Sequence, residues 1–319
     1  MADALAVRTP TRPRLRAGWL QDNGVYVALV AILLINLAIT PHFITVSNLR
    51  QQLIQVVPVV IVGLGMALVI GTEGIDLSVG SVMAIAAAVL PLYIGYGPAV
   101  AVVVALIAGV LTGLLGGWLV ASIGVQPIVA TLALLVGGRG LANVIGGRQK
   151  TIRDHTLLDL GSGNILGVPF VVLVAVILIA AVAFVVRKTN FGRQLVAVGG
   201  NRVASELAGL PVKRILLSVY IISGVLAAAA GVLATARLTA SVPSNLGNLI
   251  ELSAITAVVV GGTPLSGGRV RVVGTVAGAL LMQLISSTLI AHNLHDSIAQ
   301  MVQAAIIVVA VFVQRGRRS

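Results

Sequence analysis

The sequence contains no cysteine and few charged or aromatic residues. Without cysteine, disulfide bonds, thiolate metal sites and thiol chemistry are all excluded. Charged residues make up 9% of the 319 residues and hydrophobic residues 58%, whereas a soluble domain has about 25% charged residues. Aromatic residues amount to only 3%, which leaves few flat side chains on which a ring-shaped ligand could stack. This composition indicates an integral membrane protein.

Apolar segments recur along the whole chain. A helix needs about 17–25 such residues to cross the hydrocarbon core, and the second, third and eighth segments are shorter, so their full crossing stays open. We therefore expect an all-α polytopic fold with about ten transmembrane helices. They cover residues 24–40, 55–70, 81–94, 99–122, 127–145, 168–186, 215–234, 249–261, 272–290 and 297–314.

The distribution of lysine and arginine predicts the orientation. With the N-terminus in the cytoplasm, fifteen of the 21 basic residues fall on the cytoplasmic side, as the positive-inside rule requires. An even number of spans then places the C-terminus there too. We expect a basic tail over residues 1–23, a transmembrane domain over 24–314 with a cytoplasmic loop at 187–214, and a second basic tail over 315–319. Because the positive charge flanks the spans, no nucleic acid partner is expected.

Three glycines of the fourth segment recur every fourth residue. Gly109, Gly113 and Gly117 therefore lie on one helix face, where another backbone can approach closely. Packing against a helix of the same chain is the simpler interpretation, and a homodimer contact is the alternative.

Two carboxylates interrupt the apolar sequence between the second and third segments. Glu73 and Asp76 lie in a glycine-rich stretch over residues 71–81. Each charge would cost about 2.5–3.5 kcal/mol at the membrane centre. A cavity, a protein interface or a solvated loop must therefore receive them.

The loop at residues 187–214 contains a second helix signal. Asn201 can cap a short helix that runs through Ala208, while Gly209 and Pro211 provide a stop. A helix of about two turns is too short to be stable alone, so it must dock on a partner or on the membrane surface.

Three motifs in this order resemble one family. They are residues 74–80 (GIDLSVG), the loop segments 189–193 (TNFGR), 197–201 (AVGGN) and 208–212 (AGLPV), and residues 260–268 (VGGTPLSGG). They are similar to permease subunits of bacterial binding-protein-dependent sugar importers of the ABC class, of the ribose, xylose and galactose type. The resemblance extends over residues 48–314 and is strongest to permeases for galactofuranose. Glu73 departs from the family, which often has glycine there, and so do residues 270–272.

The resemblance implies a transport subunit of the bacterial inner membrane rather than an enzyme, with no cofactor. Such a permease forms the path for a monosaccharide, together with a second copy or a similar chain. A separate ATPase subunit supplies energy, and a periplasmic or lipid-anchored binding protein delivers the sugar. The absence of a G-x-x-x-x-G-K-[ST] phosphate loop agrees with this division of labour. By resemblance, the residues expected to couple the chain to the ATPase are Arg193, Asn201, Glu206 and Gly209.

Polar residues within apolar segments are the candidates for the translocation path. An intramembrane arginine such as Arg139 is functional by default, although its side chain could also reach the interface. Asn143 follows one turn later, and Gln283 adds a second amide. The remaining candidates are the motif residues Asp76, Ser78 and Ser266. Glu251 opens the eighth segment and is interpreted as an end-cap charge.

Two other function classes stay open at this point. An ion-coupled secondary transporter of a small polar solute would use Glu73, Asp76 and Arg139 as its charged groups. A membrane-embedded enzyme would need a nucleophile and a base together, and no His-Asp-Ser arrangement suggests one. Of the four histidines, only His292 and His295 are close in sequence, so no metal site is expected.

Overall fold

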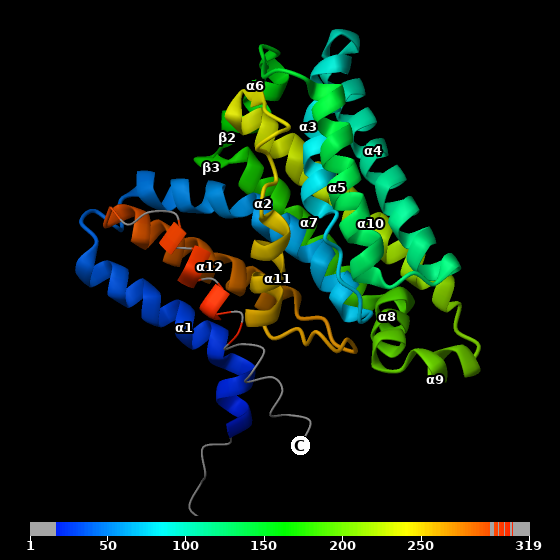
Figure 1. Cartoon of the computed structure of the whole chain (residues 1–319). Coiled ribbons are helices and arrows are strands. Elements are labelled where there is room, and N and C mark those ends of the chain that lie inside the picture. Colours follow the sequence, from blue (N-terminus) through cyan, green and yellow to red (C-terminus); the bar gives the residue numbers. More distant parts are fainter. Residues whose placement is uncertain (1–16, 294–296, 299, 303, 307, 309–319) are drawn as a thin grey trace, which may run out of the picture.

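The chain forms one helical bundle with an all-helical core (Figure 1). The computed structural model describes residues 17–293, 297–298, 300–302, 304–306 and 308. The long helices are α1 (Ala17–Ile39), α2 (Val46–Gly71), α3 (Val79–Tyr93), α4 (Pro98–Trp118), α5 (Pro127–Gly146), α7 (Phe170–Lys188), α10 (Val212–Leu238) and α12 (Val272–Ala291). The short ones are α6 (His155–Ser162), α8 (Asn190–Gly200), α9 (Arg202–Leu207) and α11 (Ile250–Val260), with a 3-10 turn at Ile94–Tyr96 and a π-helical turn at Leu119–Ile123.

Helix α10 lies at the centre and packs on α4, α2 and α3. In Figure 1, α3, α4, α5 and α10 run side by side, while α1, α12 and the first half of α2 lie across them. Most of α2 and α10 is buried, whereas only 17% of the most apolar window of α5 and of α7 is buried. Because these outward faces are apolar, the helices at the rim face lipid.

Seven of the described helices are long and apolar enough to cross a membrane, and Asn23–Ile39 of α1 and helix α11 are shorter apolar segments. The expected length of the second segment was wrong, because α2 begins at Val46 and has 26 residues. Its polar residues continue the helix since they bond to α12: Gln55 Oε1 accepts a hydrogen bond from Gln283 Nε2 at 2.7 Å. The eighth segment is indeed short, with 11 residues in α11. The N-terminal tail before residue 17, half of the tenth segment and the tail over 315–319 lie outside the described residues.

The connection from α10 to α11 turns back into the bundle. Its first residues form β4 (Ala240–Ser241), which pairs antiparallel with β1 (Lys150–Thr151) after α5. Ser241 Oγ then donates to the Ala87 carbonyl of α3 at 2.6 Å. The remaining strands, β2 (Asn164–Ile165) and β3 (Val168–Pro169), form a two-residue hairpin before α7. Helix α11 is short, and residues 239–249 precede it as non-helical chain in which Ala240, Ser241, Pro243 and Leu246 are buried.

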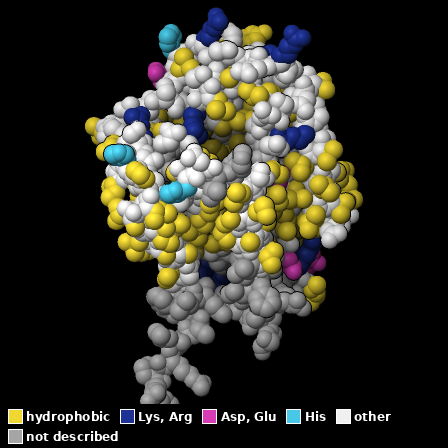
Figure 2. Space-filling view, turned by 60° about the vertical axis from the view of Figure 1, so that its left-hand side comes forward, with side chains coloured by type: hydrophobic (Ala, Val, Ile, Leu, Met, Phe, Trp, Pro, Cys, Tyr) yellow, Lys and Arg dark blue, Asp and Glu magenta, His cyan; other side chains and the backbone are white. Residues whose placement is uncertain are grey.

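Hydrophobic side chains form a belt across the surface (Figure 2). In this view the visible Lys and Arg side chains lie above the belt and near its lower edge. The exposed apolar residues include Ile107 and Leu111 of α4 and Ile177 and Phe184 of α7. This pattern is that of a protein surrounded by a bilayer.

The glycine face of α4 packs on α10 of the same chain. A Cβ atom at Gly109 would lie 2.5 Å from the Gly224 carbonyl oxygen, and one at Gly113 would lie 2.4 Å from the Tyr220 carbonyl oxygen. The prediction of close backbone packing within the chain is confirmed. The two helices approach at distances that only glycine permits.

We expect Gly113→Ala to destabilise the protein by about 1–3 kcal/mol, because its new methyl group would meet backbone atoms of α10 that cannot rotate away. Gly137→Ala is the matched control, since nothing lies within 4 Å of a Cβ atom there. Thermal unfolding of both variants in detergent checks the prediction. We expect a lowered midpoint for Gly113→Ala alone. Equal midpoints would contradict it.

Candidate functional site

The N-terminus of α3 lies inside the bundle and carries a buried carboxylate. Asp76 is only 2% exposed. Its Oδ1 accepts hydrogen bonds from the Ser78 backbone N–H at 3.0 Å and from Ser78 Oγ at 2.6 Å. Its Oδ2 accepts one from Ser223 Oγ of α10 at 2.8 Å. The carboxylate therefore connects the non-helical segment between α2 and α3 to the central helix α10.

A second carboxylate reaches the same helix terminus. Glu251, in the first turn of α11, is 7% exposed, and its Oε2 has no hydrogen-bond partner among the described residues. A Cβ atom at Gly80 would lie 2.5 Å from this oxygen and 3.2 Å from Arg139 Nη2. The end-cap position of Glu251 on α11 is as expected, but its contact with α3 was not foreseen. The partial positive charge of a helix N-terminus favours carboxylates in such a position.

Arg139 of α5 points inward to the returning segment before α11. Its Nη1 donates to the Leu246 carbonyl at 2.6 Å, and its Nη2 donates to the Gly247 carbonyl. The guanidinium thereby satisfies two carbonyls of non-helical chain inside the bundle. It also lies close enough to Glu251 for the two charges to interact. Arg139 thus holds residues 246–247 beside the N-terminus of α3.

Two further hydrogen bonds join helix α5 to the non-helical segment between α2 and α3 and to the first turn of α3. Thr131 Oγ1 donates to the Ile75 carbonyl at 3.1 Å, and Ser81 Oγ donates to the Leu134 carbonyl at 3.1 Å. Gly138 leaves room for this serine, since a Cβ atom there would lie 2.6 Å from Ser81 Oγ. The break between α2 and α3 is therefore a fixed structure rather than a solvated loop.

Tyr220 of α10 is a member of this site that sequence reasoning missed. Its side chain is 1% exposed, and its hydroxyl has no hydrogen-bond partner among the described residues. A Cβ atom at Gly74 would lie 2.8 Å from that hydroxyl. A lone tyrosine and a serine three residues later, within an otherwise apolar span, were the available signals.

Three glycine-containing segments meet next to the non-helical segment between α2 and α3. They are the end of α2, helix α8 and the loop before α12. The Gly71 carbonyl accepts a hydrogen bond from Gly268 N–H at 3.0 Å. A Cβ atom at Gly199 would lie 1.8 Å from that carbonyl oxygen, and one at Gly267 would lie 2.6 Å from the Gly199 oxygen. We call residues 71, 199, 267 and 268 the glycine junction. It joins the segment just before the first motif to the other two motifs, and half-buried Ser266 lies next to it.

The loop at residues 187–214 contains two short helices, α8 and α9, where the sequence predicted one. Thr189 caps α8 by accepting from Gly192 N–H at 3.3 Å, and Asn201 caps α9 by accepting from Ala204 N–H at 2.9 Å. The cap at Asn201 is as expected, and α9 ends at Leu207. Gly209 follows with a φ of 78°, which glycine adopts without strain.

The polar side chains of this helix pair face outward. Arg193 and Glu206 are exposed. Arg193 Nη2 donates to Asn190 Oδ1, and Glu206 pairs with Arg202 at 3.4 Å. The helices α8 and α9 therefore present a charged surface beside the junction.

The remaining path candidates lie apart from one another. Asn143 is exposed on α5. Gln283 of α12 donates to Gln52 Oε1 at 3.2 Å and to Gln55 Oε1 of α2. Thr288 extends this amide cluster by donating to Asn36 of α1 at 2.8 Å. The polar groups thus form one charged site at α3 and one uncharged network between α1, α2 and α12.

A metal site finds no support in the described part of the chain. No group of three or more His, Cys, Asp or Glu side chains there could hold an ion. His295 lies outside the described residues.

Comparison with known proteins identifies the family. Residues 48–311 match the family described as branched-chain amino acid transport system / permease component. The galactofuranose transporter permease protein YtfT of Escherichia coli K12 is 36% identical over 96% of this chain and 93% of its own length. The ribose import permease protein RbsC of the same strain is 36% identical over 94% and 95%. The L-arabinose ABC transporter permease protein AraH of Azospirillum brasilense is 30% identical over 98% and 94%. No solved structure matches the chain.

The chain belongs to this family of transport permeases. The predicted resemblance is confirmed, and so is the prediction of a transport subunit rather than an enzyme. Its family and its apolar helices place it in the bacterial inner membrane. An ion-coupled secondary transporter is not favoured by these relatives.

We expect Asp76→Asn to abolish transport or assembly, because the amide replaces one of two buried acceptors and removes the charge at the terminus of α3. Glu73→Gly is the matched change: Glu73 is exposed with a φ of 66°, so glycine relieves about 1–2 kcal/mol of backbone strain. Uptake assays and co-purification of partner subunits measure both. Equal tolerance of the two variants would mean that the motif is only a turn.

Arg139→Ala should reduce uptake strongly, because it leaves the carbonyls of Leu246 and Gly247 without their donor at a cost of about 1–3 kcal/mol each. Arg139→Lys should recover only part, since a lysine lacks the planar fork that reaches both. Arg148→Ala, at an exposed arginine just beyond the same helix, is the control. Normal uptake in Arg139→Ala would remove this residue from the site.

Proposed function

We propose that the chain is the permease subunit of a binding-protein-dependent ABC importer and forms the membrane path for a monosaccharide. A separate ATPase subunit supplies the energy, a periplasmic or lipid-anchored protein delivers the sugar, and a second permease chain, identical or similar, completes the path. The relatives support this, because their names assign galactofuranose, ribose and arabinose transport to them. A pentose or hexose is therefore the substrate class.

The observation that carries the proposal is the glycine junction. Through it, helix α8 contacts the end of α2 and the loop before α12 by closely approaching backbones, with the side chains of Leu195 and Val270 packed against Gly71. An importer needs such a connection, because hydrolysis outside the membrane must move helices inside it. We assign Arg193, Asn201, Glu206 and Gly209 to the surface that meets the ATPase.

Ten spans with both termini in the cytoplasm fit this arrangement. Starting inside, α1, α2, α3, α4, α5, α7, α10, α11 and α12 cross in alternating directions, and residues 297–314 supply the tenth span. The loops after α2, α7 and α11 then share the cytoplasmic side, and their contact at the glycine junction supports that topology. The basic tails 1–23 and 315–319 would lie on the same side.

The path residues follow from the same division. Asp76, Ser78 and Arg139 belong to the charged site at α3, whose neutral partners are hydroxyls and carbonyls. Asn143 and Gln283 offer amides, which hydrogen-bond sugar hydroxyls in either direction. Ser266 lies where the path would meet the coupling surface. A sugar needs many weak polar contacts of this kind to pass without being trapped.

The proposal is tested by reconstituting the chain with its co-expressed ATPase and binding protein in lipid vesicles. Uptake of ribose, arabinose and galactose, and ATP hydrolysis stimulated by each sugar with the binding protein, are measured. Uptake that requires both partners is expected. Transport driven by an ion gradient without ATP would overturn the proposal.

Gly209→Pro should uncouple hydrolysis from uptake. Proline fixes φ near −65° and has no N–H, whereas Gly209 has a φ of 78° and donates to the Glu206 carbonyl at 3.0 Å. The end of α9 would therefore change shape while the spans stay folded. Gly147→Pro is the matched control, because Gly147 also has a positive φ, 58°, and donates to the Asn143 carbonyl. Gly147 lies at the C-terminal end of α5 and not in the loop that contains α9. Normal transport by Gly209→Pro would refute the coupling assignment.

A further inference from the structure

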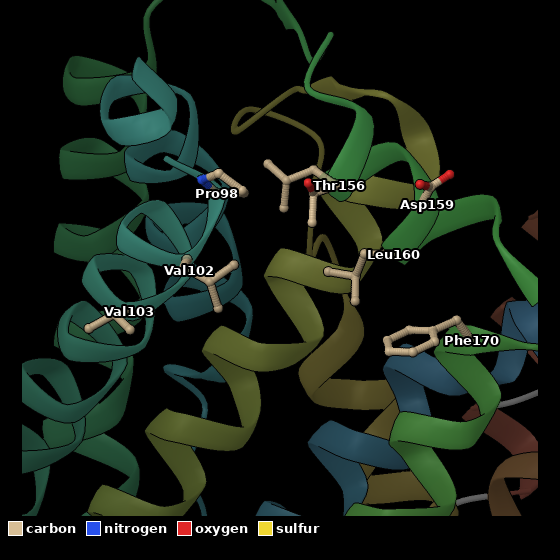
Figure 3. Close-up of a pocket in the computed structure, with 9 residues that line it drawn as sticks. Pro98, Val102, Val103, Thr156, Asp159, Leu160 and Phe170 are labelled. Carbon is tan, nitrogen blue, oxygen red and sulfur yellow. The ribbon is translucent and has the colours of Figure 1, made fainter. Parts of the chain in front are cut away.

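A groove of about 580 Å³ opens on the side of the bundle, between the first turns of α4, helix α6 and the start of α7 (Figure 3). Its walls are mainly apolar. Val102 of α4, Leu160 of α6 and Phe170 of α7 point into a shared space. Its volume is within the range of sites that hold small molecules, about 300–1,000 Å³.

The groove lies at the end of the bundle opposite α8 and α9. Helix α4 begins there at Pro98, whereas its other end packs on the first turns of α10 through Gly117. Helix α6 sits over the other end of α10, since a Cβ atom at Gly161 would lie 2.4 Å from the carbonyl of Ala236. In the topology proposed above, α4 begins a span at this end, which puts the groove near one boundary of the hydrocarbon layer, where lipid chains join their headgroups.

The lipid-facing surface runs directly into this groove. On α4, Val103 lines the groove with 53% of its side chain exposed, and Ile107 and Leu111 continue the same face at intervals of four residues. On α7, Phe170 lines the groove, and Ile177 and Phe184 continue toward the other end. An acyl chain of the surrounding bilayer thus reaches the groove without crossing polar surface.

The mouth of the groove has a different chemistry. Thr156 and Asp159 of α6 lie above the apolar walls in Figure 3, three residues apart on one helix face. The side chain of Asp159 is exposed. An apolar floor with a carboxylate and a hydroxyl at the boundary fits an amphiphile whose polar end carries a positive charge.

We propose that this groove binds one acyl chain of a phospholipid with an amine headgroup, with the ammonium of phosphatidylethanolamine beside Asp159. Helix α6 has only eight residues and packs mainly on α10 and α7. A helix of that length needs tertiary contacts to be stable. The lipid fills the space that separates α6 from α4 and so holds this cap in place.

The test uses the full chain in vesicles of phosphatidylethanolamine and phosphatidylglycerol, extracted in mild detergent, with retained lipids counted by native mass spectrometry. Ala99→Trp fills the groove from an exposed position on its wall. Retention of phosphatidylethanolamine should fall about tenfold, the effect of displacing two buried methylene groups. Val100→Trp, also exposed but outside the groove, should retain lipid as the unmodified chain does.

Asp159→Asn should reduce the preference for phosphatidylethanolamine over phosphatidylglycerol by about two- to fivefold, as expected for an exposed ion pair. Unchanged retention in Ala99→Trp would overturn the proposal. A change in the number of permease chains per particle with unchanged lipid would assign the groove to a second copy instead. If Ala99→Trp does not fold, Val103→Trp carries the same test, and added phosphatidylethanolamine should raise its unfolding temperature less than that of the unmodified chain.

Discussion

The N-terminus of α3 lies inside the protein, and its first amide groups must be satisfied without water. Two carboxylates are brought to this end by different segments: Asp76 accepts hydrogen bonds from Ser78 and from Ser223 of α10, and Glu251 of α11 lies against Gly80. Because each buried carboxylate would be costly alone, hydroxyls of α10 and the guanidinium of Arg139 surround them. The first motif, the returning segment before α11 and the central helix thus meet around these charged groups.

The sequence predicted the parts of this site that have local signals. Asp76 stood out as a charge between apolar runs, Arg139 as a charge within one, and Asn201 as a cap, and the fold class followed from the apolar segments. The approach of Glu251 to Gly80 could not be predicted, because it depends on residues 239–249 returning into the bundle as non-helical chain. Ser223 and Tyr220 carried no signal beyond their polarity, since serine and tyrosine also occur in ordinary packed spans.

The predicted start of the second span was wrong for a related reason. By hydropathy, the polar residues Asn48 and Gln52 lie outside the apolar run, so the second span was predicted to begin only at Gln55. In the structure these amides remain in α2: Gln52 and Gln55 bond to Ser287 and Gln283 of α12, and Asn48 Oδ1 accepts from Gln52. The cost of a polar group in a membrane depends on its partner, and a partner more than 200 residues away is not visible in a local window. Helix α8 was missed similarly, because its glycines resemble a loop until the junction that needs them is seen.

The glycine junction has a mechanical meaning beyond close packing. Where two elements touch through long side chains, a shift of about an ångström is absorbed by changes of rotamer. At Gly71, Gly199 and Gly268 the backbones approach closely and share a direct backbone hydrogen bond, and the side chains of Leu195 and Val270 pack against Gly71. We therefore expect a displacement of α8 to move the end of α2 and the loop before α12 with it. Three glycine-containing segments, distant in sequence, thus form one closely packed joint, and the missing side chains of its glycines allow the backbones to approach.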